Sequence, residues 1–254
     1  MSYYERRSRG YPQQYGIDEY QKSLVLHKFT DGFILAAIVA AIMVFLPQFT
    51  TMFLIFGIVG YIVSIIGYFF ARKESTINTL YFVFVAASSA FLGFTFQTLL
   101  TVLENGAQII LGAFGGTALI VGYLWYKVDS EHPDPNYVGR NLTKYSLIFL
   151  AMLLLGWFVF TSALFYLIIS VFGAALFSLY FYYDLARLKA GQFSSPARMA
   201  WSMYWDILLI FRYLLNILVM LFGRNKNTIP TQSFGKDTTK YPYLIINSVY
   251  PSGY

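Results

Sequence analysis

The chain has 254 residues, of which 57% are hydrophobic, 20% are aromatic and only 12% are charged. A soluble domain has about 25% charged residues, so this composition excludes an ordinary soluble fold and indicates a protein of the lipid bilayer. The net charge of +6 comes mostly from loops and tails, which indicates membrane topology rather than nucleic-acid binding. The absence of cysteine excludes disulfides, thiol nucleophiles and cysteine metal sites.

Residues 1–27 form a polar N-terminal tail. The tail has no apolar core, so it is not a secretory signal peptide. Its arginines and serines are typical of a mitochondrial presequence, whereas Asp18 and Glu19 argue against a cleaved presequence. The sequence is therefore compatible with two locations, the bacterial plasma membrane and the mitochondrial inner membrane.

Residues 28–223 contain seven apolar segments, each long enough to cross a bilayer as one helix. The segments lie near 30–47, 51–71, 77–103, 107–126, 143–160, 163–183 and 200–222. The prediction is an all-α membrane protein, a bundle of seven transmembrane helices. Residues 224–254 follow as a C-terminal tail rich in polar and aromatic residues.

Connections that contain lysine or arginine alternate along the chain with connections that contain neither. Lysines and arginines occur before the first segment and after each even-numbered segment, and the other connections between segments have none. This positive-inside pattern places the N-terminus on the cytosolic or matrix side, with the connections near Arg72, Arg140 and Arg187. The seventh segment can either span or re-enter, and its length favours spanning.

Two acidic residues stand where apolar segments meet this basic side. Asp184 ends the stretch FSLYFYYD, and Asp206 lies twenty-two positions later in MYWDILLIF. A helix capped by Ser194 or Ser195, with Pro196 in its first turn, places Asp206 about 15 Å along, so both acids can lie at similar depth. Two carboxylates in a low dielectric resist double ionisation and share a proton, which can act as a switch. The alternative is two unrelated interfacial acids, each beside a helix end.

These stretches resemble a known family. FSLYFYYDLARLK, followed by SMYWDILLIFRYLL, is similar to the paired motif of the sixth and seventh helices of the Bax inhibitor-1 family. AFGGTALI at 113–120 resembles a stretch of the family's fourth helix. The resemblance covers roughly residues 28–223. It implies seven helices with a central seventh helix, and a pH-sensitive cation leak, usually for calcium, under an aspartate latch.

The resemblance also implies the residues of the latch. Asp184 and Asp206 would be the two aspartates, and a basic residue at the end of the second helix would pair with the first of them. Arg72 is the best match for this residue and Lys73 the second. The alternative for Arg72 is a basic residue that only anchors the topology.

The chain departs from the resemblance within the seventh segment. Leu209 and Tyr213 stand where polar residues are expected, and Arg212 is an intramembrane charge that needs a partner or snorkels to the surface. These departures, together with the tails 1–27 and 224–254, keep a second function open. In this second function the protein is a structural accessory subunit of a larger membrane complex. The fold and the tails contact other subunits, and the protein transports no ion.

No enzymatic activity is expected. The aspartates lack the G-x-G-D and P-A-L motifs of intramembrane aspartyl proteases, and the two histidines, His27 and His132, lie in polar flanks without a G-x-S neighbour. The sequence has no metal or cofactor constellation, so calcium is expected only as a permeant ion. The glycines of 112–122 indicate helix packing rather than a phosphate site.

Overall fold

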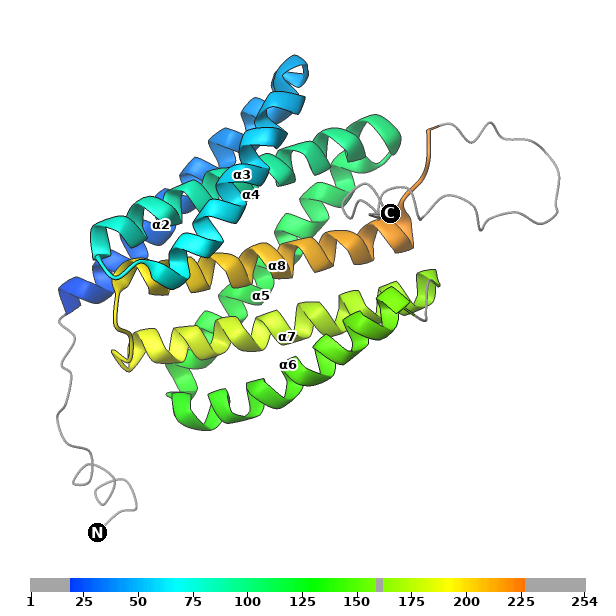
Figure 1. Cartoon of the computed structure of the whole chain (residues 1–254). Helices are drawn as coiled ribbons and strands as arrows, with labels where there is room; N and C mark the ends of the chain where they lie inside the picture. Colours follow the sequence, from blue (N-terminus) through cyan, green and yellow to red (C-terminus); the bar gives the residue numbers. More distant parts are fainter. Residues whose placement is uncertain (1–18, 159–161, 227–254) are drawn as a thin grey trace, which may run out of the picture.

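The computed structural model describes residues 19–158 and 162–226 of the chain. Within these ranges it consists of seven long α-helices and one 3-10 turn (Figure 1). In chain order the elements are α2 (Glu19–Phe45), η1 (Pro47–Phe49), α3 (Thr50–Phe70), α4 (Glu74–Val102), α5 (Gly106–Glu131), α6 (Pro135–Phe158), α7 (Ala163–Lys189) and α8 (Pro196–Phe222). The predicted all-α bundle of seven helices is confirmed.

Each of these seven helices is long and apolar enough to cross a membrane. The outside of the bundle is apolar as well, most clearly along α3. Exposed large side chains there include Ile55, Phe56, Val59, Ile62, Ile66 and Phe70. Apolar surface of this extent is unfavourable in water and matches lipid tails, so the fold is that of a multi-pass integral membrane protein.

The seventh of the helices, α8, lies at the centre of the bundle. It packs against α2, α4, α5 and α7, and Figure 1 shows it crossing the middle of the molecule between α4 and α7. Its buried side chains include Met203 and Ile210, neither of which has exposed surface. The central position expected for this helix is therefore observed.

Aromatic side chains fix α8 against α4. The rings of Trp201 and Trp205 stack on Phe84, with centroid distances of 4.9 and 5.0 Å. The hydroxyl of Tyr204 lies 3.3 Å from the hydroxyls of both Ser88 and Ser89. Stacked rings add to the free energy of burial, and the hydroxyl contacts satisfy the one polar atom that Tyr204 brings into the core.

The N-terminal end of α8 is capped from two directions. The Ser195 hydroxyl accepts a hydrogen bond from the backbone N–H of Arg198 at 3.2 Å, which confirms a predicted cap. Glu74, in the first turn of α4, accepts hydrogen bonds from the Ser195 hydroxyl and, at 3.0 Å, from the Ala197 N–H. The Arg198 guanidinium donates to the Ala71 carbonyl at 2.7 Å. The loop between α3 and α4 is thus attached to the start of α8.

The C-terminal end of α8 meets the opposite end of α4. The side-chain amide of Asn105, just after α4, donates to the Phe222 carbonyl at 2.7 Å, and the Glu104 N–H donates to the Arg224 carbonyl at 2.9 Å. Because its two ends contact the two ends of a membrane-spanning helix, α8 spans as well and does not re-enter.

The helices extend further than the apolar segments predicted. The first helix begins at Glu19 instead of near residue 30, and α6 begins at Pro135 instead of near 143. Hydropathy marks only the part of a helix suited to hydrocarbon, whereas the backbone hydrogen bonds continue into the polar interface. Of the expected tails, residues 1–18 and 227–254 lie outside the described residues.

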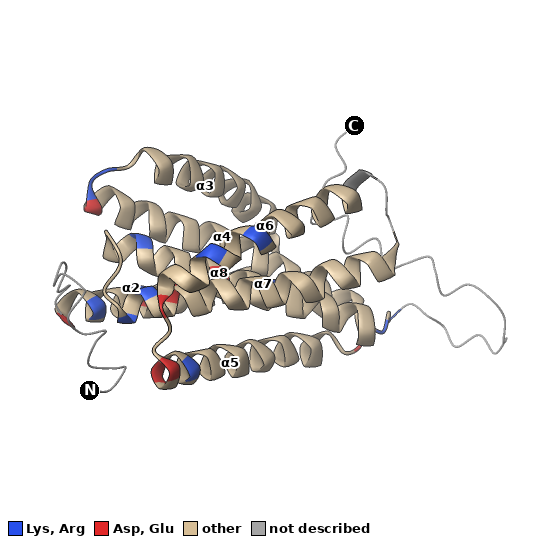
Figure 2. Cartoon of the chain, turned by 90° about the horizontal axis from the view of Figure 1, so that it is seen from below, with Lys and Arg blue, Asp and Glu red and all other residues tan. Residues whose placement is uncertain are grey.

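Charged residues gather at one end of the bundle. Figure 2 shows Lys, Arg, Asp and Glu concentrated where α2 begins, where α3 joins α4 and where α5 ends. Asp129 of α5 pairs there with Lys189 of α7. The Tyr182 hydroxyl donates to the Glu131 carboxylate at 3.0 Å. This grouping agrees with the alternation of charge in the sequence.

Candidate functional site

Asp184 and Asp206 are both buried inside the bundle. Only 2% of the surface of Asp184 and 4% of that of Asp206 is exposed. Asp184 lies near the C-terminal end of α7, Asp206 lies about three turns into α8, and these two helices pack against each other. The two carboxylates are near enough for their charges to interact. The structure therefore brings the predicted pair together.

The surroundings of Asp184 include one cation and one hydroxyl. Arg187, one turn further along α7, donates from Nη1 to Asp184 Oδ1 at 3.4 Å and is partly exposed. The side chain of Ser202 on α8, one turn before Asp206, also interacts with Asp184. The second oxygen, Asp184 Oδ2, is buried without a hydrogen-bond partner in the described part of the chain.

The surroundings of Asp206 offer fewer groups that could balance a negative charge than those of Asp184 do. Its Oδ2 atom is buried without a hydrogen-bond partner within the described ranges, and no salt bridge to it occurs there. An ionised carboxylate in such a place is costly. A proton shared with Asp184, or a bound cation, would compensate the charge.

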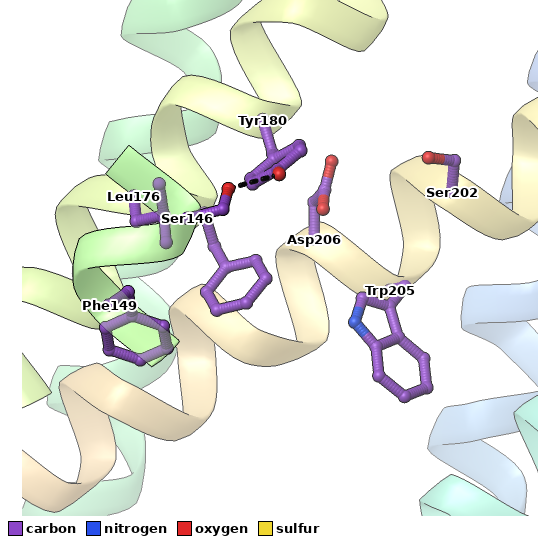
Figure 3. A pocket seen from close by; sticks show the side chains of 8 residues that line it. Ser146, Phe149, Leu176, Tyr180, Ser202, Trp205 and Asp206 are labelled. Atoms are coloured by element: carbon purple, nitrogen blue, oxygen red, sulfur yellow. Dashed lines mark hydrogen bonds between the residues drawn. The ribbon is translucent and has the colours of Figure 1, made fainter. Parts of the chain in front are cut away.

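A pocket of about 340 Å³ opens beside Asp206, between α6, α7 and α8. Figure 3 shows the carboxylate of Asp206 turned toward Tyr180, whose hydroxyl lies 2.5 Å from that of Ser146. The rings of Phe149 and Phe177 form apolar walls. The pocket therefore combines one acid with hydroxyl groups and aromatic rings. Sequence reasoning missed it because its residues come from three helices.

Arg72 lies at the same end of the bundle as Asp184 but does not pair with it. It is exposed in the loop between α3 and α4, and it makes no hydrogen bond or salt bridge with another described residue. Arg187 provides the cation beside Asp184 instead. Sequence reasoning assigned Arg187 only to membrane topology, although its i,i+3 spacing from Asp184 was a usable signal.

The three departures in the seventh segment lie on α8 beyond Asp206. Tyr213 packs against the pocket wall, with its ring 5.8 Å from that of Phe177 and over Gly173. Arg212 is partly exposed and has an interaction partner within the structure. Leu209 is partly exposed too.

The described residues contain no group of three or more His, Cys, Asp or Glu side chains that could hold a metal ion. A cation at the aspartate pair would therefore have two carboxylates at most. Calcium prefers six to eight oxygen ligands, so such a cation would keep much of its water.

Seven apolar helices around a buried acid pair define a multi-pass integral membrane protein of the helical-bundle class. A family model described as "Inhibitor of apoptosis-promoting Bax1" matches residues 26–224, and the chain therefore belongs to the Bax inhibitor-1 family.

The chain is also similar to bacterial proteins without an assigned function. An uncharacterized protein of Helicobacter pylori (strain J99) is 27% identical over 203 residues, which cover 79% of this chain and 86% of the relative. An uncharacterized protein of Campylobacter jejuni is 33% identical over 135 residues, which cover 50% of this chain and 58% of the relative.

Proposed function

We propose that the protein is a pH-sensitive cation leak, with calcium as the permeant ion, gated by Asp184 and Asp206. The observation that carries the proposal is the burial of both carboxylates on adjacent helices, one of which is central in the bundle. Each has one oxygen without a hydrogen-bond partner in the described part of the chain. Acidic residues at such depth are typical of ion and proton pathways.

A shared proton is the element that responds to pH. With one carboxyl protonated, the pair can hydrogen-bond and hold α7 against α8, which closes the path. When both are ionised at higher pH, they repel each other or bind a cation. The leak therefore increases as the pH rises through the range in which the pair loses its proton.

Arg187 and Ser202 adjust this switch. The guanidinium of Arg187, 3.4 Å from Asp184 Oδ1, stabilises the ionised carboxylate. The Ser202 side chain comes from α8 and interacts with Asp184 of α7, so it links the two helices that separate on opening. The two side chains thus connect Asp184 to a cation on its own helix and to the neighbouring helix α8.

The test is calcium entry into proteoliposomes, followed with an enclosed dye across a pH series. The isosteric variants Asp184→Asn and Asp206→Asn should each flatten the pH response, and the double variant should add little because coupled residues act as one unit. Glu104→Gln, an exposed acid at the far end of the bundle, is the matched control and should behave as wild type.

Two outcomes would contradict the proposal in different ways. A wild-type protein without flux at every pH would remove the leak and leave the accessory-subunit function, in which the tails 1–27 and 224–254 contact other subunits. Flux with an unchanged pH response in both aspartate variants would keep a leak and remove the aspartate gate.

A further inference from the structure

The pocket beside Asp206 lies at the level of the lipid tails. Its lining residues Phe149, Phe177 and Asp206 belong to the middle turns of α6, α7 and α8. The pocket is open to its surroundings rather than enclosed. The helix α6, which contributes Ser146 and Phe149 to the lining, also exposes a row of leucines, including Leu147, Leu150 and Leu154. A molecule that enters at this depth comes from the bilayer and must itself partition into lipid.

The chemistry of the pocket selects among such molecules. Most of its wall is apolar, and Phe149, Phe177 and Tyr180 contribute aromatic rings. Asp206 is the acid in the lining, and its Oδ2 atom lacks a hydrogen-bond partner in the described part of the chain. Aromatic rings and a carboxylate together recognise organic ammonium ions, through cation–π attraction and a charge-assisted hydrogen bond.

We propose that this pocket binds an amphiphilic amine from the bilayer, with its ammonium group on Asp206 and its alkyl chain against Phe149 and Phe177. A volume of about 340 Å³ holds the ammonium end and several carbons. The rest of the chain extends through the opening into lipid. The Ser146 and Tyr180 hydroxyls, paired at 2.5 Å, supply an acceptor for a second N–H of the ammonium group.

An inorganic divalent cation fits the pocket less well than an amine. Calcium takes six to eight oxygen ligands, whereas the lining offers one carboxylate, three hydroxyls and otherwise apolar atoms. An ammonium group needs only two or three acceptors, and the remaining contacts of an amphiphile are apolar. Binding of the amine requires the Asp206 carboxylate but no ion flux, so it stands or falls separately from the leak.

The test uses dodecylamine with a diazirine in the middle of its chain, photolysed in proteoliposomes that contain the full chain. Mass spectrometry maps the labelled residues, which should lie on α6 and α7 beside the pocket. Unlabelled dodecylamine should remove this labelling. Dodecanol and lauric acid at equal membrane concentration should not, because they lack the ammonium group.

The carboxylate is tested with Asp206→Asn, and Glu104→Gln is the control at an exposed acid far from the pocket. Loss of a charge-assisted hydrogen bond should reduce the competed labelling by about tenfold or more, whereas the control should label as wild type. Unchanged labelling in a folded Asp206→Asn protein would overturn the proposal. Dodecanol that competes as well as dodecylamine would also overturn it, and this arm needs only the wild-type chain.

Discussion

The carboxylate of Glu74 in α4 accepts a hydrogen bond from the backbone N–H of Ala197 in α8 at 3.0 Å. A helix begins with N–H groups that have no partner inside the helix, and here a residue more than a hundred positions earlier supplies one. Glu74 also places negative charge at the positive end of the helix dipole. The contact therefore fixes the start of the helix that contains Asp206.

Replacing Glu74 with alanine should lower the stability of the bundle. Loss of a helix cap costs about 1 kcal/mol, and the Ser195 hydroxyl also loses its acceptor. The expected result is a lower midpoint of thermal unfolding in detergent, followed by circular dichroism. Glu104→Ala is the control, because Glu104 is exposed and only its backbone takes part in a described contact. Equal midpoints for the two variants would contradict the capping role.

Removing the cation beside Asp184 should shift the pH response of the leak. Without Arg187, the ionised carboxylate loses a favourable charge at 3.4 Å, so a higher pH is needed to ionise it. Arg187→Ala should therefore move the midpoint of calcium flux toward higher pH. Arg72→Ala should leave it nearly unchanged, because Arg72 is exposed and makes no described hydrogen bond or salt bridge. A larger shift for Arg72→Ala would restore the pairing that the family resemblance implied.

Much of the fold could be predicted from the sequence because the bilayer imposes strong conditions. Hydropathy located the seven helices, and the motif around Asp184 and Asp206 located the acid pair. The helix starts at Glu19 and Pro135 could not be read from hydropathy, since polar residues continue a helix into the interface.

The partners of the acids were harder to predict, because they depend on how helices rotate against each other. Periodicity places Ser202 one turn before Asp206 on α8 but does not show that it interacts with Asp184 of α7. The contact between Ser146 and Tyr180 joins α6 to α7 and has no sequence signature. Such contacts follow from side-chain packing, which a single sequence does not specify.

The membrane topology can be tested with single cysteines, because the chain has none of its own. Gln48→Cys lies between α2 and α3, and Lys73→Cys lies just before α4, at the other end of α3. An impermeant maleimide added to intact cells or spheroplasts should label one of these positions and not the other. The unsubstituted chain provides the background. Labelling of both cysteines from one side would contradict a spanning α3.

A glycine at the contact between α2 and α4 should tolerate no side chain. A β-carbon added to Gly32 would overlap the Tyr81 hydroxyl, which donates to the Lys28 carbonyl at 3.1 Å. Tyr81 is completely buried, so any shift of its ring disturbs the packing around it, and Gly32→Ala should destabilise the bundle by about 1–3 kcal/mol.

The matched control for this substitution is Gly115→Ala, where an added β-carbon meets no atom within 4 Å. Alanine favours a helix over glycine by about 1 kcal/mol, so this variant should be as stable as wild type or slightly more stable. The measurement is thermal unfolding of both variants in the same detergent. Equal losses at Gly32 and Gly115 would contradict a specific role for the contact with Tyr81, because only Gly32 lies against that side chain. A Tyr81→Phe change in the Gly32→Ala background should recover part of the stability, because it removes the overlapping oxygen.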